Sequence, residues 1–186
     1  DHLRTMLRAG YKVTVAEQEE ELRPGAKLLE RVATRVYTPG SLYEEGLLNG
    51  DEQSLLAAVV LGNDALGLAV IDASTGKAWA STHAGSDRMV RLHDELLRWQ
   101  PSELGVSPKA AGDEGLGRLF PLMESTMVSQ HKLSPAKRDE RLRAMLNVAD
   151  LGHLDLDHAP LAISATGLAA DYLATVHLQP DVPLQD

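Results

Sequence analysis

Two imidazoles and two carboxylates lie close together in the segment HLDLDH, residues 153–158. Histidine nitrogens and carboxylate oxygens are ligands that zinc and related divalent ions accept, so this segment could bind a metal. No open tetrahedral ligand spacing of the kind found in zinc sites appears here, and the alternation of Asp with Leu is typical of a turn that leads into a helix. We therefore expect a turn, with Asp157 or His158 capping a helix ahead of Pro160.

Asp72 is a candidate ligand for a metal-dependent nuclease. Such enzymes bring several carboxylates from different strands onto two divalent ions. The apolar strand expected before it, Leu55 to Leu61, contains no carboxylate. Asp72 also precedes the turn residues Ser74-Thr75-Gly76, where an aspartate accepts turn hydrogen bonds. The structural role is favoured, and metal-dependent nuclease activity is kept as the alternative function.

Two further motifs resemble catalytic signatures only in part. Residues 134–137, SPAK, match a serine-lysine nucleophile pattern, but Ser134 before Pro135 is the N-cap and first-turn pair of a helix. The GLG of residues 115–117 lacks the preceding strand and the later glycine of a dinucleotide site, and no phosphate-binding loop of the Gly-x4-Gly-Lys-Ser/Thr kind is found. We expect neither a catalytic residue, nor a metal, nor an ATP site in this chain.

Composition limits the partners that the chain could bind. Its 186 residues include 18 Lys and Arg against 27 Asp and Glu, a net charge of −9, so any contact with DNA must be local. It contains no cysteine, which excludes disulfides and thiolate metal sites. The apolar runs are shorter than the ~20 residues of a membrane helix. We expect a cytoplasmic protein without membrane contact, and, because the sequence starts in mid-pattern, a fragment of a longer chain.

The elements that must position these residues fall into two groups. In the first group a helix over residues 1–9 ends at Gly10, a strand alternates through residues 11–15, an acidic loop or short helix follows, and a second strand spans residues 31–38. Residues 41–53 have the composition of a linker. The periodicity therefore places residues 1–40 in one domain and starts another at Ser54.

From Ser54 onward the pattern predicts three strands in succession and then alternating helices and strands. The strands are expected at residues 55–61, 66–74, 77–81, 103–107 and 125–130. Ser86 is expected to cap a helix whose buried face carries Met89, Leu92, Leu96 and Leu97, and residues 109–117 are expected to be irregular. A helix spans residues 137–146. The stripe of the last helix consists of Leu161, Ala165, Leu168, Ala169, Tyr172, Leu173 and Val176, with Gly167 allowing close approach to a sheet.

This order of elements indicates an α/β protein. A three-stranded antiparallel meander followed by alternating helices and strands matches the ribonuclease H-like architecture, a mixed sheet covered by helices. The expected organisation is the end of a small α+β domain at residues 1–40, a linker at 41–53, a ribonuclease H-like domain at 54–178, and the beginning of a further region at 179–186.

Six blocks of the sequence together resemble the MutS family of bacterial DNA mismatch recognition proteins. The blocks are DHLRTMLRAGYKVTVAEQ, RVATRVYTPGSLYEEGLL, LLAAVV, GLAVIDASTGKAWAS, QPSEL and APLAISATGLAADYL. The first two are similar to the end of the family's mismatch-binding domain, the others to its connector domain, and residues 179–186 to the start of the lever region. The family's TPGT is TPGS here, and its Gly-Phe-Gly before the last helix is Gly152-His153-Leu154.

The resemblance implies a function for the fragment. It would be a non-catalytic connector that links mismatch binding to the ATPase and docks a MutL-type protein. The parent protein would bind mismatched double-stranded DNA, use ATP and magnesium, and form a homodimer through parts absent here. The family's Phe-x-Glu wedge is absent, since the single phenylalanine is Phe120 in the connector-like region. The fragment itself should therefore not discriminate mismatches.

Site residues follow from the resemblance and from charge. Arg4, Arg8, Lys12 and Arg35 are candidates for contacts with DNA, with solvated basic side chains as the alternative. The charged helix at residues 137–146 and the end of the last helix would form the face for the MutL-type partner, while Leu142, Met145 and Leu146 face the core. A solvated helix with weak ion pairs is the alternative. The partner-binding candidates are Arg138, Glu140, Arg141 and Thr175.

Overall fold

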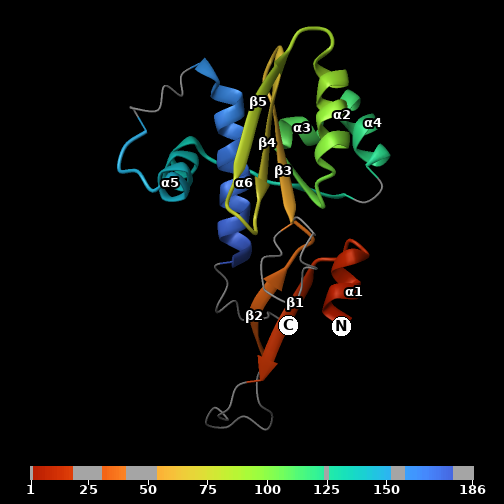
Figure 1. The fold of residues 1–186 in the computed structure, drawn as a ribbon, viewed down its shortest axis with the longest axis vertical. Helices are drawn as coiled ribbons and strands as arrows, with labels where there is room; N and C mark the ends of the chain where they lie inside the picture. Colours follow the sequence, from red (N-terminus) through yellow and green to blue (C-terminus); the bar gives the residue numbers. More distant parts are fainter. Residues whose placement is uncertain (1, 19–30, 41–53, 124–125, 152–157, 178–186) are drawn as a thin grey trace.

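The computed structural model describes residues 2–18, 31–40, 54–123, 126–151 and 158–177. The strands form two sheets, a two-stranded sheet of β1 and β2 and a five-stranded sheet in the order β5-β4-β3-β6-β7 (Figure 1). No described helix is long and apolar enough to cross a membrane.

The first forty residues form a helix and a hairpin-like pair of strands. Helix α1, His2–Arg8, ends at Gly10, whose φ of 82° is the left-handed conformation that glycine adopts at low cost. Strand β1, Val13–Gln18, then pairs antiparallel with β2, Arg31–Tyr37. The helix-to-strand unit is confirmed, but Tyr11 precedes the strand and is 65% exposed. The acidic segment at residues 19–25 lies outside the described residues.

The five-stranded sheet has the predicted meander as its first half. The meander consists of β3, Leu55–Leu61, β4, Ala65–Asp72, and β5, Ala78–Ala84, and β4 runs antiparallel to both β3 and β5. Strand β6, Glu103–Val106, lies parallel to β3 on its other side, and β7, Met127–Gln130, lies parallel to β6. The sheet is therefore mixed, as expected, and β5 extends three residues beyond the predicted end at residue 81.

Helices cover both faces of this sheet (Figure 1). Helix α6, Pro160–His177, packs on one face with α5, Pro135–Leu146, beside it. Helices α2, Arg88–Trp99, α3, Pro108–Ala111, and α4, Glu114–Leu119, with the short 3₁₀ turn η1 at Phe120–Leu122, lie on the other. Alternate residues of β3 enter the two apolar clusters, Leu55, Ala57 and Val59 on one side and Leu56 and Ala58 on the other. A strand buried on both faces needs no polar positions, which explains its unbroken apolar sequence.

Two glycines mark the close approaches of α6. A Cβ added to Gly67 on β4 would lie 2.1 Å from the carbonyl oxygen of Leu161, so this glycine lets the helix backbone reach the sheet. A Cβ added to Gly167 would instead lie 2.4 Å from Cγ of Arg138 on α5. The prediction that Gly167 faces the sheet is wrong, because that residue occupies the side of α6 that packs against α5.

Three local predictions on the other face are also wrong. Helix α2 begins at Arg88 with Asp87 as the N-cap residue, and the Asp87 side chain makes no capping hydrogen bond because it pairs with Arg91 at 2.7 Å. Leu97 is 49% exposed, since Leu92 and Leu96 already face the core. The segment expected to be irregular contains α3 and α4. Their N-caps, Ser107 and Asp113, outweigh the local glycines.

Candidate partner surface on helices α5 and α6

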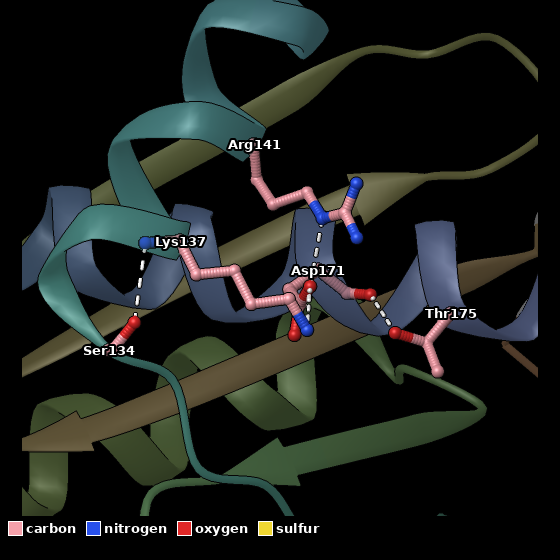
Figure 2. Close-up of polar contacts among 5 residues, drawn as sticks. All are labelled: Ser134, Lys137, Arg141, Asp171 and Thr175. Atoms are coloured by element: carbon pink, nitrogen blue, oxygen red, sulfur yellow. Dashed lines mark hydrogen bonds and ion pairs between the residues drawn. The ribbon is translucent and has the colours of Figure 1, made fainter.

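Helix α5 is fixed at both ends by its sequence. The Ser134 hydroxyl accepts a hydrogen bond from the Lys137 backbone N–H at 3.3 Å, and Pro135 occupies the first turn (Figure 2). Asn147 ends the helix in the left-handed conformation at φ 53°. The N-cap prediction for Ser134 is confirmed. The two polar residues of the SPAK motif therefore have structural roles, because the Lys137 ammonium reaches across to α6.

Two basic side chains of α5, those of Lys137 and Arg141, point toward Asp171 on α6 (Figure 2). The Arg141 Nε lies 2.8 Å and the Lys137 Nζ 3.0 Å from Oδ1 of Asp171, whose side chain is 13% exposed. Burial opposes ionisation, but hydrogen bonds and charge from Arg141 and Lys137 hold the pKa of the Asp171 carboxyl below its ordinary value. Two of the charged side chains of α5, Lys137 and Arg141, therefore fix α5 to α6.

Sequence reasoning did not identify Asp171, although a signal was present. It is the only acidic residue in the 18 residues of α6, which otherwise contain apolar, small or uncharged side chains and a terminal histidine. A lone carboxylate in such a helix needs a partner when the helix is packed on two sides. The partner is supplied by the neighbouring helix, 30 positions earlier in the chain.

The four predicted partner-binding residues do not form one free charged face. Arg141 is bound to Asp171, and the Arg138 Nε lies 2.7 Å from Oδ1 of Asp139 while its aliphatic stem packs over Gly167. The Thr175 hydroxyl donates to the Asp171 carbonyl oxygen at 2.8 Å (Figure 2). Of the three charged residues among the four, Glu140 is the one that is exposed and has no ion pair to another described residue.

The apolar side of α5 is also more open than expected. Leu142 is buried, but Met145 is 36% and Leu146 is 43% exposed, so the prediction that all three face the core is wrong. Next to Met145 lies a pocket of about 270 Å³ between α5, α6 and the β4–β5 turn. Its lining is mainly apolar and includes Ile71, Ala144, Met145 and Leu173, with Arg141 among its polar atoms.

The four predicted DNA-binding residues lie in the first forty residues. Arg4 and Arg8 belong to α1, Lys12 lies just before β1, and Arg35 is on β2, opposite Val15 of β1. Arg8, Lys12 and Arg35 are exposed, and Arg4 is half-buried. The Arg35 guanidinium donates to the Tyr37 hydroxyl at 3.3 Å. Helix α1 contacts β1, so the candidate cations belong to one small unit.

The candidate metal ligands have other roles or lie outside the described residues. The Asp72 carboxylate accepts hydrogen bonds from the Ser74 N–H at 2.9 Å, the Ser74 hydroxyl at 2.6 Å and the Thr75 hydroxyl at 2.8 Å, which confirms its turn role. Burial opposes ionisation, but these donors hold the pKa of Asp72 below its ordinary value. Within the described ranges no three His, Asp or Glu side chains could share a metal ion. Residues 153–157 of the HLDLDH segment are not among them.

The fold and the surface on α5 and α6 define the class of protein. It is an α/β protein with helices on both faces of a mixed five-stranded sheet, and a two-stranded sheet precedes it in the chain. The family model described as MutS domain II matches residues 54–185, and that of MutS domain I matches residues 1–46. The chain belongs to the MutS family, and the resemblance found in its sequence is confirmed.

Proteins similar to this chain along its whole length are named as MutS proteins. The chain is 34% identical to the DNA mismatch repair protein MutS of Thermosynechococcus vestitus, over 100% of this chain and 22% of that protein. It is 35% identical to the protein of that name from Trichormus variabilis, over 97% of this chain and 22% of that protein. It is 30% identical to the protein of that name from Symbiobacterium thermophilum, over 95% of this chain and 20% of that protein. The chain thus spans about a fifth of the length of these relatives.

A comparison of folds finds a more distant likeness. A crystal structure of a Fowlpox virus resolvase with its Holliday junction substrate matches 67% of this chain and 99% of the viral chain. The TM-score is 0.45 and the sequence identity 11%, values that carry no conclusion about this chain.

Proposed function

We propose that this chain is part of a mismatch recognition protein of the MutS type. Residues 1–40 would be the C-terminal part of the mismatch-binding domain, residues 41–53 a linker, residues 54–178 a ribonuclease H-like connector, and residues 179–186 the start of the lever region. The meander of β3, β4 and β5 followed by helices and the parallel strand β6 supports the ribonuclease H-like assignment. The connector would be non-catalytic, since Asp72 is bound in a turn and β3 has no carboxylate.

The connector would link mismatch binding to the ATPase of the whole protein and dock a MutL-type partner. The observation that carries the docking proposal is the apolar pocket beside Met145, with exposed charged residues of α5 near it. An apolar centre surrounded by mixed charge is the usual composition of a protein interface. Glu140 and Arg143 are exposed on α5 and would set the rate of association more than the final affinity.

Binding kinetics with the MutL-type protein test this docking surface. Ala144→Glu would place a charge in the pocket and should weaken binding of the intact parent protein at least tenfold. Reversing Glu140 and Arg143 together should slow association at low salt and matter less at high salt. Arg141 is left unchanged, because its ion pair with Asp171 is structural.

Val90→Glu is the matched control, since Val90 is 61% exposed on α2 on the other face of the sheet. Equal effects of Ala144→Glu and Val90→Glu would place the docking surface elsewhere.

Residual DNA contact would come from Arg4, Arg8, Lys12 and Arg35. These side chains would bind phosphates or reach the minor groove without reading the base sequence. Binding of the 186-residue chain should be weak, should fall steeply with salt, and should be equal for matched and mismatched duplexes. Replacing Lys12 and Arg35 by Ala should reduce it further, measured by fluorescence anisotropy. A strong preference for mismatched duplex would contradict this proposal.

The remaining parts of the proposal concern the whole protein. By family membership it would bind mismatched double-stranded DNA, use ATP with magnesium, and act as a homodimer in the cytoplasm. Its ATPase would use residues outside this chain. Purified parent protein should hydrolyse ATP, and exchange of the 54–178 region should alter how mismatched DNA stimulates that activity.

A further inference from the structure

Strand β5 forms an open edge of the five-stranded sheet. It pairs with β4 on one side, and no described strand pairs with its other side, which lies between α6 and α2 (Figure 1). The edge is seven residues long, from Ala78 to Ala84, and contains neither a charged residue nor a proline. Its register with β4 is regular along the whole strand. A long, regular and uncharged edge of this kind favours pairing with a further strand.

The other edges of the described sheets are protected against such pairing. Strand β7, at the far edge of the same sheet, has only four residues. In the two-stranded sheet the register shifts between Val15 and Ala16 of β1, and β2 carries Arg31 and Arg35. Short strands, irregularities and charged side chains are the usual means by which proteins prevent edge-to-edge contact. Strand β5 has none of these three features.

The hydrogen-bond pattern shows which backbone groups of β5 point away from the sheet. The Asp72 N–H donates to the Lys77 carbonyl oxygen at 2.9 Å, so residue 77 turns its backbone groups toward β4. Because bonding alternates along an antiparallel strand, Trp79, Ser81 and His83 also turn theirs toward β4. The residues whose N–H and C=O groups point outward are all exposed, namely Ala78, Ala80, Thr82 and Ala84.

These outward groups can pair with their counterparts in a second copy of the chain. In an antiparallel pair centred on Ser81, every residue of β5 lies opposite a residue of the other copy. Ala78 then pairs with Ala84 and Ala80 with Thr82, so each outward N–H and C=O meets an outward group of the other strand. Any other register that aligns the outward groups leaves residues unpaired at the ends of both strands. The sequence of β5 is therefore complementary to itself.

On the face covered by α2, this register places an exposed aromatic ring opposite an imidazole. Trp79 is 39% exposed, and its ring lies on that of Trp99 of α2 with ring centroids 4.7 Å apart. The residue opposite Trp79 is His83 of the second copy, in a pair without backbone hydrogen bonds, where the side chains of two strands approach most closely. The symmetric interface contains this aromatic cross-strand pair twice, and such pairs stabilise sheets.

The two ends of β5 carry opposite charges. Lys77 precedes the strand and Asp87 follows it, and both residues are exposed. Strand alternation places Lys77 on the α2 face with Trp79, and Asp87 is the N-cap residue of α2, where it also pairs with Arg91. Antiparallel pairing brings Lys77 of each copy beside Asp87 of the other, whereas parallel pairing would bring like charges together. Charge complementarity therefore favours an antiparallel second copy as the occupant of this edge.

The helices leave room for a continuous sheet. Helix α6 packs most closely on β4, one strand in from the edge. The two α6 helices would then be separated by three strand spacings of ~4.8 Å, which is more than the ~8–10 Å between packed helices. Helix α2 packs on both β4 and β5, so the two α2 helices would be about two strand spacings apart, close to the distance of packed helices.

We propose that β5 is a self-association edge, through which two copies of this chain pair antiparallel about Ser81 into one continuous sheet. This contact is additional to the homodimer contacts proposed for the parent protein, which lie outside this chain. One pair of strands buries less surface than a permanent dimer requires, so the association is reversible and depends on concentration.

Sedimentation velocity of the 186-residue chain over a concentration series tests the proposal. The dimer fraction should rise with concentration. Ala80→Lys combined with Thr82→Lys sets lysine opposite lysine across the two strands and should lower the association constant at least tenfold. Ala80→Lys combined with Thr82→Glu sets lysine opposite glutamate at the same positions and should keep the association constant near that of the original chain. Both variants replace exposed residues, so their circular dichroism spectra should match that of the original chain.

Disulfide formation tests the register. The chain has no cysteine, so Ser81→Cys provides a single sulfur in each copy at the centre of the interface. The two Cα atoms would be about 4.5 Å apart, within the range of a disulfide. Thr82→Cys is the matched control, because residue 82 lies two positions from its own counterpart, with the Cα atoms about 9 Å apart and beyond that range. Oxidised glutathione should link Ser81→Cys into a covalent dimer and leave Thr82→Cys unlinked.

A variant at the other edge of the sheet locates the contact. Val128 is exposed on β7, and Val128→Lys should associate as the original chain does. The proposal is overturned if the chain stays monomeric over the whole concentration series, or if the two double variants have equal association constants. It is also overturned if Ser81→Cys is not linked more readily than Thr82→Cys, or if Val128→Lys weakens association as much as the pair of lysines on β5.

Discussion

Arg141 on α5 and Asp171 on α6 are joined by an ion pair of 2.8 Å between Nε and Oδ1, and both side chains are largely shielded from water. This pair orients α5 along α6 and thereby forms one wall of the pocket beside Met145. Arg141 was predicted to bind the partner directly. It instead supports, through Asp171, the surface that we propose the partner contacts.

Arg141→Ala should lower the free energy of unfolding by about 1–3 kcal/mol, between the values typical of exposed and of buried ion pairs. The cost arises because the Asp171 carboxylate keeps its burial and loses its shorter contact. Arg91→Ala is the control, since the Arg91–Asp87 pair has side chains 59% and 51% exposed and should contribute less than about 1 kcal/mol. Urea denaturation measures both. Equal losses would show that the α5–α6 pair is not structural.

Gly67→Ala should destabilise the chain by about 1–3 kcal/mol through overpacking. The added methyl group would meet the backbone of Leu161, which cannot move without shifting α6. Gly117→Ala is a matched substitution in α4, where the methyl group would meet nothing within 4 Å, and it should be neutral or stabilising by up to about 1 kcal/mol. Thermal unfolding distinguishes the two. A neutral Gly67→Ala would contradict the close contact between β4 and α6.

Asp72 should contribute stability that is lost in acid. Its folded pKa lies below the ordinary value of 3.8, so the contribution is present above 3.8 and disappears as the pH falls through the folded pKa. Asp72→Asn should therefore flatten the lower end of the stability-versus-pH curve, measured by urea denaturation at each pH. Thr75→Val removes one of the donors to Asp72 and should flatten it less. A curve unchanged by Asp72→Asn would mean that the turn does not favour the ionised form.

Leu168→Asp should cost several kcal/mol, enough to unfold a domain of ordinary stability. Leu168 is 3% exposed and packs with Leu56, Ala58 and Ile71, so the new carboxylate would be buried without a partner. Leu146→Asp on α5 is the comparison, because Leu146 is 43% exposed and can keep a charge in water. Circular dichroism should show loss of the cooperative transition in the first variant and its retention in the second.

The sequence by itself determined the order of the strands and of the longer helices, the meander, the N-cap at Ser134, the turn role of Asp72 and membership of the family. These features depend on local chemistry: the period of apolar residues, the hydrogen bonds that a side chain offers to its own backbone, and motifs of contiguous residues. The unbroken apolar run of β3 also indicated burial on both faces, because no polar position is needed when helices lie above and below a strand.

Only the tertiary structure decided which faces meet. Gly67 rather than Gly167 allows α6 to reach the sheet, and Asp171 finds its partner across 30 positions of the chain. Helical periodicity shows which residues share a face but not which neighbour that face contacts, since the neighbour depends on how α5, α6 and the sheet pack. For the same physical reason Arg141 is held by Asp171, whereas Glu140, one position away on the same helix, faces solvent.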